Sequence, residues 1–144
     1  MKKLVVLIIL LYISCIPLAA QIFTIQTTSK ETCFYDTTKK DWGSWSKAEK
    51  IVVSVTIDVK QLLIIINDRP KEIFKLVGYI KEKKDEKDTW ISSIFNSVDK
   101  EGKKPVICIQ IFDTGVCIIG VIYLFDKIYR YYGTIVKQPV LITT

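Results

Sequence analysis

The stretch that decides the fold is VICIQIFDTGVCIIGVIYLF, which runs from Val106 to Phe125. Two runs of β-branched and aromatic residues flank the three-residue loop 113–115, in which Gly115 supplies the positive φ that such a loop needs. This spacing predicts a β-hairpin. With Phe112 opposite Val116, the odd-numbered residues of both strands share one continuous apolar face, because side chains alternate between the two faces of a strand.

Similar signals recur at short intervals along the rest of the chain. Strands are predicted at residues 22–28, 51–57, 62–66, 73–80 and 128–132, with an edge strand at 136–142. Seven or eight short strands separated by turn signals are typical of an all-β domain. The expected fold is an antiparallel meander that forms a strongly bent sheet or a small barrel.

Residues 89–98 admit two interpretations. A strand ending at Val98, with Asp99-Lys100-Glu101-Gly102 as its hairpin turn, explains the residues that follow. The alternative is an amphipathic helix, because Trp90, Ile94 and Val98 recur at helical spacing. The serines in this segment are poor helix formers, so the strand is the prediction.

The first twenty residues have the pattern of a cleavable signal peptide. Two lysines precede the apolar run 4–13, and small residues ending at Ala20 indicate cleavage before Gln21. We therefore expect a signal helix at 1–20 and one all-β domain at 21–144. This domain is predicted to be extracytoplasmic, either periplasmic or secreted.

Two alternatives for the amino terminus stay open. Residues 4–20 could be retained as a membrane anchor, although Pro17 interrupts a stretch that is already short for a membrane span. Alternatively, Cys15 could carry a lipid, because Ser14-Cys15 is similar to the end of a lipobox. Contact with a membrane is expected only in these two cases.

The charge pattern argues against a nucleic-acid partner. The net charge of +6 becomes +4 when the two lysines of the signal are removed, and the chain holds only two arginines. Lysines and acids alternate in the segment 81–88, which we interpret as a solvated loop. A nucleic-acid-binding protein would gather its basic residues on one face. An unidentified protein or glycan is the partner class that the sequence favours.

No catalytic, metal-binding or cofactor-binding residue can be assigned from the sequence. The chain contains no histidine, which removes Ser-His and Cys-His nucleophile pairs and the commonest metal ligand. It also lacks a glycine-rich phosphate loop and a zinc-type cysteine spacing. The aspartates at predicted turns have a structural explanation, and they are listed together: Asp58, Asp68, Asp99, Asp113 and Asp126.

Three cysteines remain after cleavage of the signal, Cys33, Cys108 and Cys117, so at most one internal disulfide can form. The hairpin register places Cys108 and Cys117 on opposite faces, so they cannot pair with each other. A disulfide would therefore have Cys33 as one end. Buried free thiols are the alternative.

Two aromatic groups are candidates for binding. Trp42 and Trp45 lie three residues apart in a polar loop, where they could form a contact patch for a sugar or a protein, or fold back onto the domain. Tyr129 and Tyr131 share one face of a predicted strand. Such a pair is typical of cross-strand packing and could also serve as a ligand platform.

The order of several short motifs resembles a known group of proteins. These are the Ala20-Gln21 junction, the loop Trp42-Gly43-Ser44-Trp45-Ser46, the turn 99–102 before a cysteine-containing strand, and the aromatic last strand. Together they resemble the small, uncharacterised secreted β proteins of Bacteroidetes-type bacteria and their phages. The resemblance implies an all-β fold and no established activity, and no catalytic residue is carried over from it.

Three functions are weighed on this basis. The leading hypothesis is a non-enzymatic binding or protein-interaction domain of the cell envelope, because the chain combines a β fold with an aromatic loop and no histidine. The second is a carrier that holds a small apolar ligand in a barrel cavity. The third is a hydrolase that uses carboxylates, which would need two acids converging in a cleft.

Overall fold

The computed structural model describes residues 22–87 and 89–136, which form an all-β domain without a helix. The predicted signal helix at 1–20 and residues 137–142 of the expected last edge strand lie outside these residues. No helix in the described part of the chain is long and apolar enough to cross a membrane. The strands are β1 (Ile22–Asp36), β2 (Asp41–Trp42), β3 (Glu49–Lys50), β4 (Ser54–Asp58), β5 (Leu63–Ile66), β6 (Glu72–Lys84), β7 (Trp90–Asp99), β8 (Val106–Phe112), β9 (Val116–Tyr123) and β10 (Lys127–Val136).

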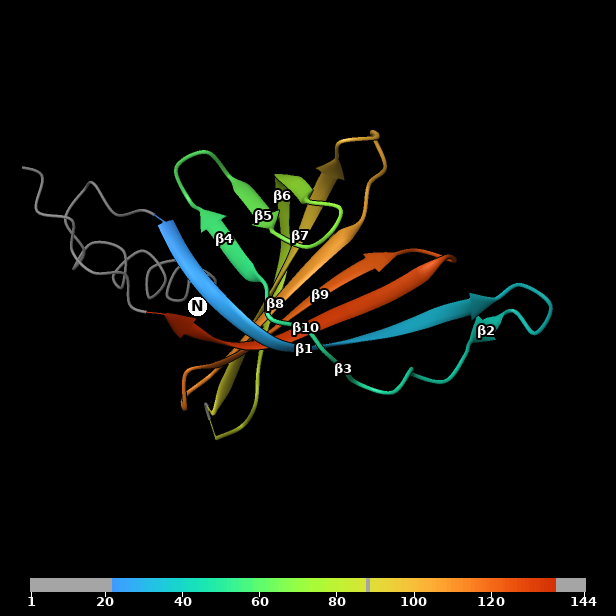
Figure 1. Ribbon diagram of the computed structural model, residues 1–144, viewed down its shortest axis with the longest axis horizontal. Helices are drawn as coiled ribbons and strands as arrows, with labels where there is room; N and C mark the ends of the chain where they lie inside the picture. The colour runs from blue at the N-terminus through green and yellow to red at the C-terminus, as the bar shows by residue number, and fades with distance from the viewer. Residues whose placement is uncertain (1–21, 88, 137–144) are drawn as a thin grey trace, which may run out of the picture.

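Eight of the strands form a closed antiparallel barrel. Each strand from β4 to β10 pairs with the next one along the chain, β4 also pairs with β1, and β10 closes the barrel by pairing with β1. Figure 1 shows the meander running from the green β4 to the red β10, with the long blue β1 beside both. The expected all-β meander and small barrel are therefore confirmed.

The interior of the barrel is filled by side chains. Inward-facing residues of alternating positions form one buried cluster, and most of them are at most 3% exposed. An eight-stranded barrel is just wide enough for its side chains to meet across the axis. The cluster consists of Ile25, Val55, Ile64, Ile66, Phe74, Ile107, Ile109, Cys117, Ile119, Val121, Tyr129 and Tyr131.

The seam between β1 and β10 closes the barrel at a point of very close backbone approach. Gly133 lies opposite Thr27, and a bulge in β1 follows between Thr27 and Ser29. A Cβ atom at Gly133 would lie 2.3 Å from the carbonyl oxygen of Gln26, far inside contact distance. Only glycine therefore allows the first and last strands to come together here.

The register predicted for the central hairpin is confirmed. Ile107, Ile109 and Ile111 lie opposite Val121, Ile119 and Cys117 respectively. The loop between the strands has Gly115 at φ 85°, as its position in the sequence required. Cys108 lies opposite Gly120, on the other face of the sheet from Cys117.

The prediction of a strand over residues 89–98 is confirmed, and the helical alternative is wrong. β7 covers Trp90–Asp99 and pairs with β6 and β8. The serines that made the segment ambiguous are buried in the sheet, and the Ser97 hydroxyl donates a 2.6 Å hydrogen bond to the Pro105 carbonyl. The turn that follows has Gly102 at φ 80°, as expected for a hairpin.

Three strands are longer than the sequence predicts. The first strand extends beyond 28 to Asp36, because β10 and the segment 41–50 supply hydrogen-bond partners for its polar half. β6 continues through the charged residues to Lys84, since β7 pairs with it over this length. The last described strand passes Gly133 and ends at Val136, because the seam with β1 extends that far.

The seam generates a prediction about stability. Replacing Gly133 with alanine should lower the free energy of unfolding by about 3 kcal/mol, because the added Cβ forces the backbones of β1 and β10 apart. Urea denaturation of the purified protein measures this change. Gly78→Ala is the matched control, since a Cβ there meets its nearest atom at an ordinary 3.7 Å. Equal effects of the two substitutions would contradict the proposed closure.

Candidate functional site

The loop that carries both tryptophans lies along the edge of β1. We call residues 41–50 the tryptophan flap. Its backbone donates from Gly43 to the Phe34 carbonyl at 2.9 Å and from Ser46 to the Thr32 carbonyl at 2.7 Å. The Ser46 hydroxyl accepts a hydrogen bond from the Thr32 amide at 2.9 Å. The flap therefore occupies the edge that β1 would otherwise expose beyond the barrel.

Trp45 attaches the flap to the outside of the barrel. Its ring is stacked on the Arg130 guanidinium, whose central carbon lies 3.7 Å from a ring centroid. Arg130 also forms a salt bridge with Glu31 at 2.9 Å, and the Tyr132 hydroxyl donates to the same carboxylate oxygen at 2.9 Å. The hydrogen bonds from Tyr132 and Arg130 lower the pKa of Glu31 and keep it ionised. Trp45 is still 39% exposed.

Trp42 belongs to an aromatic cluster at the far end of β1. Its ring meets the ring of Tyr35 edge to face at 5.3 Å, and Tyr35 meets Phe125 in the same way at 5.3 Å. The Tyr35 amide donates to the Asp126 carbonyl at 2.8 Å, which fixes the β9–β10 turn against β1. In Figure 1 the ends of β1, β2, β9 and β10 project to the same side of the barrel.

Three large apolar side chains at this end are exposed to solvent. Phe34 is 62% exposed, Leu124 is 70% exposed and Phe125 is 63% exposed. Phe125 has a φ of 59°, which is an uncommon conformation for a bulky residue and places strain in the turn. We call Phe34, Tyr35, Trp42, Leu124 and Phe125 the aromatic tip.

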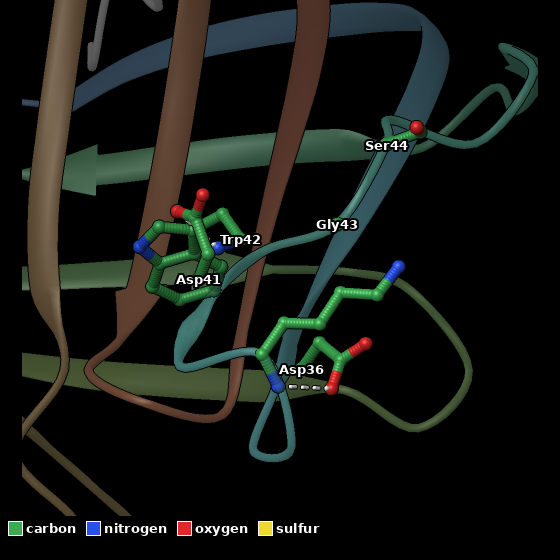
Figure 2. Close-up of a pocket in the computed structure, with 6 residues that line it drawn as sticks. Asp36, Asp41, Trp42, Gly43 and Ser44 are labelled. Atoms are coloured by element: carbon green, nitrogen blue, oxygen red, sulfur yellow. Dashed lines mark hydrogen bonds between the residues drawn. The ribbon is translucent and has the colours of Figure 1, made fainter.

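A surface hollow of about 360 Å³ lies at the base of the tip (Figure 2). Its carboxylates shape the local backbone: Asp36 accepts hydrogen bonds from the amides of Thr38 and Lys39, and Asp41 accepts one from the Trp42 amide at 2.8 Å. The hollow is therefore a polar depression formed by the turn after β1. Its lining residues are Asp36, Lys39, Asp41, Trp42, Gly43 and Ser44.

The two tyrosines of the predicted ladder lie inside the barrel, near one of its ends. Tyr129 is 3% exposed and Tyr131 is 1% exposed, and their rings pack edge to face at 5.8 Å. The Tyr129 hydroxyl donates to Glu72, and the Tyr131 hydroxyl donates to Asp68 at 2.8 Å. Both rings are therefore packed in the interior of the barrel and are not exposed on its surface.

Lys30 completes this internal network. Its ammonium lies 3.1 Å from Asp68 and about 5 Å from the centroids of both tyrosine rings. Burial raises the pKa of Asp68, but hydrogen bonds from the Arg69 amide, Tyr131 and Lys30 outweigh this effect, so the pKa is lowered overall. Burial raises the pKa of both tyrosines, and the neighbouring carboxylates add to this, so the phenols stay protonated donors.

The cysteines in the described residues are all free thiols. Cys33 is 2% exposed and donates to the Gly43 carbonyl at 3.1 Å, so the tryptophan flap covers it. Cys117 lies in the core, and burial raises its pKa to about 11. Cys108 is on the outside of the barrel, 3.0 Å from the Ser92 hydroxyl. No pair of these cysteines forms the disulfide that the sequence left open.

Sequence reasoning named Trp42 and Trp45 but missed most of the aromatic tip. The sequence predicts a loop at Phe34, beyond the first strand, and the end of a strand at Leu124 and Phe125. Their exposure depends on a tertiary contact between the end of β1 and the β9–β10 turn, about ninety residues apart in the chain. The β-rich composition around Phe34 was the one available signal that β1 continues past residue 28.

Comparison with known proteins adds no functional information. No protein-family model matches the chain, and no significant match is found among curated proteins or among solved structures. The resemblance to small secreted β proteins therefore stays a prediction. Among the described residues, no group of three or more cysteine, aspartate or glutamate side chains is arranged to hold a metal ion.

The internal network generates a prediction about pH. Asp68→Asn should lower the free energy of unfolding at pH 7 by about 2 kcal/mol, because it removes the ionic acceptor of Lys30 and Tyr131. The pKa of Asp68 is lower in the folded state, so its contribution is present above the unfolded value of about 3.9 and disappears as the pH falls through the folded value. Urea denaturation at several pH values should show the difference between the two proteins narrowing in acid.

Asp113→Asn is the control for that experiment. Asp113 is exposed in the β8–β9 turn, so its substitution should change the stability by less than about 0.5 kcal/mol at any pH. A difference for Asp68→Asn that stayed constant down to pH 2 would show that its ionised form contributes nothing.

The flap generates a second prediction. Trp45→Ala should raise the rate at which a thiol reagent modifies Cys33 by about tenfold, because the flap loses its stacking contact with Arg130 and opens more often. Mass spectrometry of the modified peptides assigns the reaction to Cys33 rather than to Cys108. Val52→Ala, a change at an exposed residue that follows the flap, should leave the rate unchanged. An unchanged rate for Trp45→Ala would mean that the stack does not hold the flap closed.

Proposed function

We propose that this chain is an exported, non-enzymatic interaction domain, and that the aromatic tip is its contact surface for a protein partner. The observation that carries the proposal is the exposure of Phe34, Leu124 and Phe125 together at one projecting end of the barrel. Large apolar side chains gathered on a surface are typical of sites where a partner excludes water.

The surroundings of these side chains support a specific site rather than an unstructured loop. Tyr35 holds both Trp42 and Phe125 by edge-to-face ring contacts, and its amide fixes the turn that carries Leu124. A contact surface that is already ordered binds with a smaller entropic cost than one that must first fold. Phe125 takes the positive φ of a turn that the Asp126 amide closes on the Tyr123 carbonyl at 3.1 Å, a position where glycine is the usual residue, so the bulky side chain is kept there at a cost in strain.

The chemistry of the tip favours a protein over a glycan. The three most exposed side chains carry no hydrogen-bonding group, whereas sugar recognition needs polar groups beside an open aromatic face. Both Trp42 and Tyr35 are half-buried, and their rings are engaged with each other. The polar hollow at the base of the tip is shaped by carboxylates that already bind backbone amides.

The other two functions receive no support from the packing. A carrier would need an apolar cavity, but isoleucine, valine and tyrosine side chains occupy the interior of the barrel. A carboxylate hydrolase would need an acid with a raised pKa to protonate a leaving group. In the internal network Asp68 has a lowered pKa and is bound to Lys30 and Tyr131, and Glu72 is bound to Tyr129.

Site-specific photo-cross-linking in the cells that export this protein tests the proposal. A benzoylphenylalanine at position 124 should form a discrete adduct with a protein partner. The substitution Phe34→Ser combined with Phe125→Ser should abolish that adduct, because it removes the neighbouring apolar contacts. Val52, which is 66% exposed but lies outside the tip, provides the matched control position. If positions 124 and 52 gave the same adducts, or position 124 gave none, the tip would not be the contact surface.

A further inference from the structure

The turn that carries Leu124 and Phe125 has a second support, which comes from the β7–β8 loop. Tyr123 lies directly before these two residues, and its hydroxyl donates a 2.8 Å hydrogen bond to Asp99 at the end of β7. β8 lies between β7 and β9 in the sheet, so this bond reaches across a whole strand. It therefore joins the turn of the aromatic tip to a second loop.

The Asp99 carboxylate is built into its own turn. One of its oxygens accepts hydrogen bonds from the amides of Glu101 and Lys103, each at 2.9 Å. The Asp99 amide donates to the Lys103 carbonyl at 2.9 Å, which closes the same turn. The second carboxylate oxygen is the one that accepts the hydrogen bond from Tyr123. Because an ionised acceptor gives a stronger hydrogen bond than a neutral one, Asp99 is a firm anchor for the tyrosine.

The Tyr123 side chain is held on the inner side of the barrel. It packs against the buried cluster, and its ring centroid lies 6.2 Å from that of Tyr129. The Lys127 ammonium lies over both rings, 5.4 Å from the Tyr123 centroid and 5.8 Å from the Tyr129 centroid. Burial raises the pKa of Tyr123, and the hydrogen bond to Asp99 raises it further, so the phenol stays a protonated donor. The residues on both sides of the turn 124–126 are thus anchored to the interior.

The conformation of the turn depends on such supports. Phe125 has a φ of 59°, and a bulky residue keeps this conformation only where its surroundings determine it. From β1, Tyr35 contacts the Phe125 ring and donates from its amide to the Asp126 carbonyl. Within the turn, the Asp126 amide donates to the Tyr123 carbonyl at 3.1 Å, so the position of Tyr123 also sets the position of the turn.

We propose that Asp99 and Tyr123 are positioning residues for the aromatic tip, because their hydrogen bond holds the β9–β10 turn in the conformation that presents Leu124 and Phe125 together. This inference rests on the proposed function of the tip as a contact surface. A partner that binds an ordered turn avoids the cost of ordering it. Loss of the bond should therefore weaken binding, although the exposed apolar side chains of the tip are unchanged.

Hydrogen exchange of the Asp126 amide in the purified protein tests the positioning role. Tyr123→Phe removes only the hydroxyl, and it should raise the exchange rate of this amide by about tenfold, because the turn opens more often without its anchor. The Ile119 amide, which lies in the middle of β9 with a paired strand on each side, reports opening of the whole barrel and should not change.

Tyr132→Phe is the matched control. It also removes a hydroxyl that donates to a carboxylate, that of Glu31 at 2.9 Å, but this contact lies beside the tryptophan flap. The exchange rate of the Asp126 amide should stay unchanged in this variant. An Asp126 amide that Tyr123→Phe leaves unchanged, or that both variants change equally, would overturn the proposal.

A double variant tests whether Asp99 and Tyr123 act as a pair. Asp99→Ala should raise the exchange rate of the Asp126 amide as Tyr123→Phe does. The two substitutions together should exceed the larger single effect by no more than about twofold, because the bond between the residues is already lost. Effects that multiply would show that the two residues act separately, which the proposal does not allow.

Photo-cross-linking from position 124 separates failure of this inference from failure of the proposed function. In the cells that export the protein, Tyr123→Phe should reduce the adduct by about tenfold, whereas Tyr132→Phe should leave it unchanged. An otherwise unchanged chain that gives no adduct would contradict the proposed function alone, because the exchange measurement needs no partner. Faster exchange of the Asp126 amide with an undiminished adduct would show that Asp99 and Tyr123 have no role in binding.

Discussion

The close approach of the first and last strands at Gly133 is the constraint on which the structure depends. The meander from β4 to β10 pairs each strand with its neighbour along the chain, so those contacts could form in an open sheet as well. The pairing of β1 with β10 is different, because it joins the two ends of the domain. It turns the sheet into a barrel and gives the inward side chains of every strand a partner across the axis.

The same seam positions the surfaces that we associate with function. β1 continues beyond its pairing with β4, which ends at Gln26, because β10 pairs with it as far as Phe34. This extension carries the tryptophan flap on one edge and receives the β9–β10 turn on the other. Trp45 is stacked on Arg130 of the last strand, so the flap is also tied to the seam. The aromatic tip therefore depends on contacts between residues that are distant in the chain.

The sequence allowed the fold class, the central hairpin and its register to be predicted. These features depend on local signals: the alternation of isoleucines in β8 and the glycine at position 115. The true length of β1 could not be predicted, because Lys30 points into the barrel where an apolar residue is expected. Asp68 and two tyrosine rings accommodate Lys30 there. These partners come from distant parts of the chain, so the sequence around Lys30 does not predict the network. Trp42 and Trp45 could be named as candidates from their local sequence. Phe34 and Phe125 could not, because their exposure depends on the contact between the end of β1 and the β9–β10 turn.

Nuclear Overhauser effects between β1 and β10 in solution test the account most directly, because both the barrel and the aromatic tip depend on this pairing. The account predicts contacts between the backbones of Lys30 and Tyr131 and between those of Cys33 and Ile128, which are neighbours in the seam. It also predicts slow hydrogen exchange for the seam amides. Rapid exchange of these amides, with no contacts between the two strands, would show an open sheet and contradict the account.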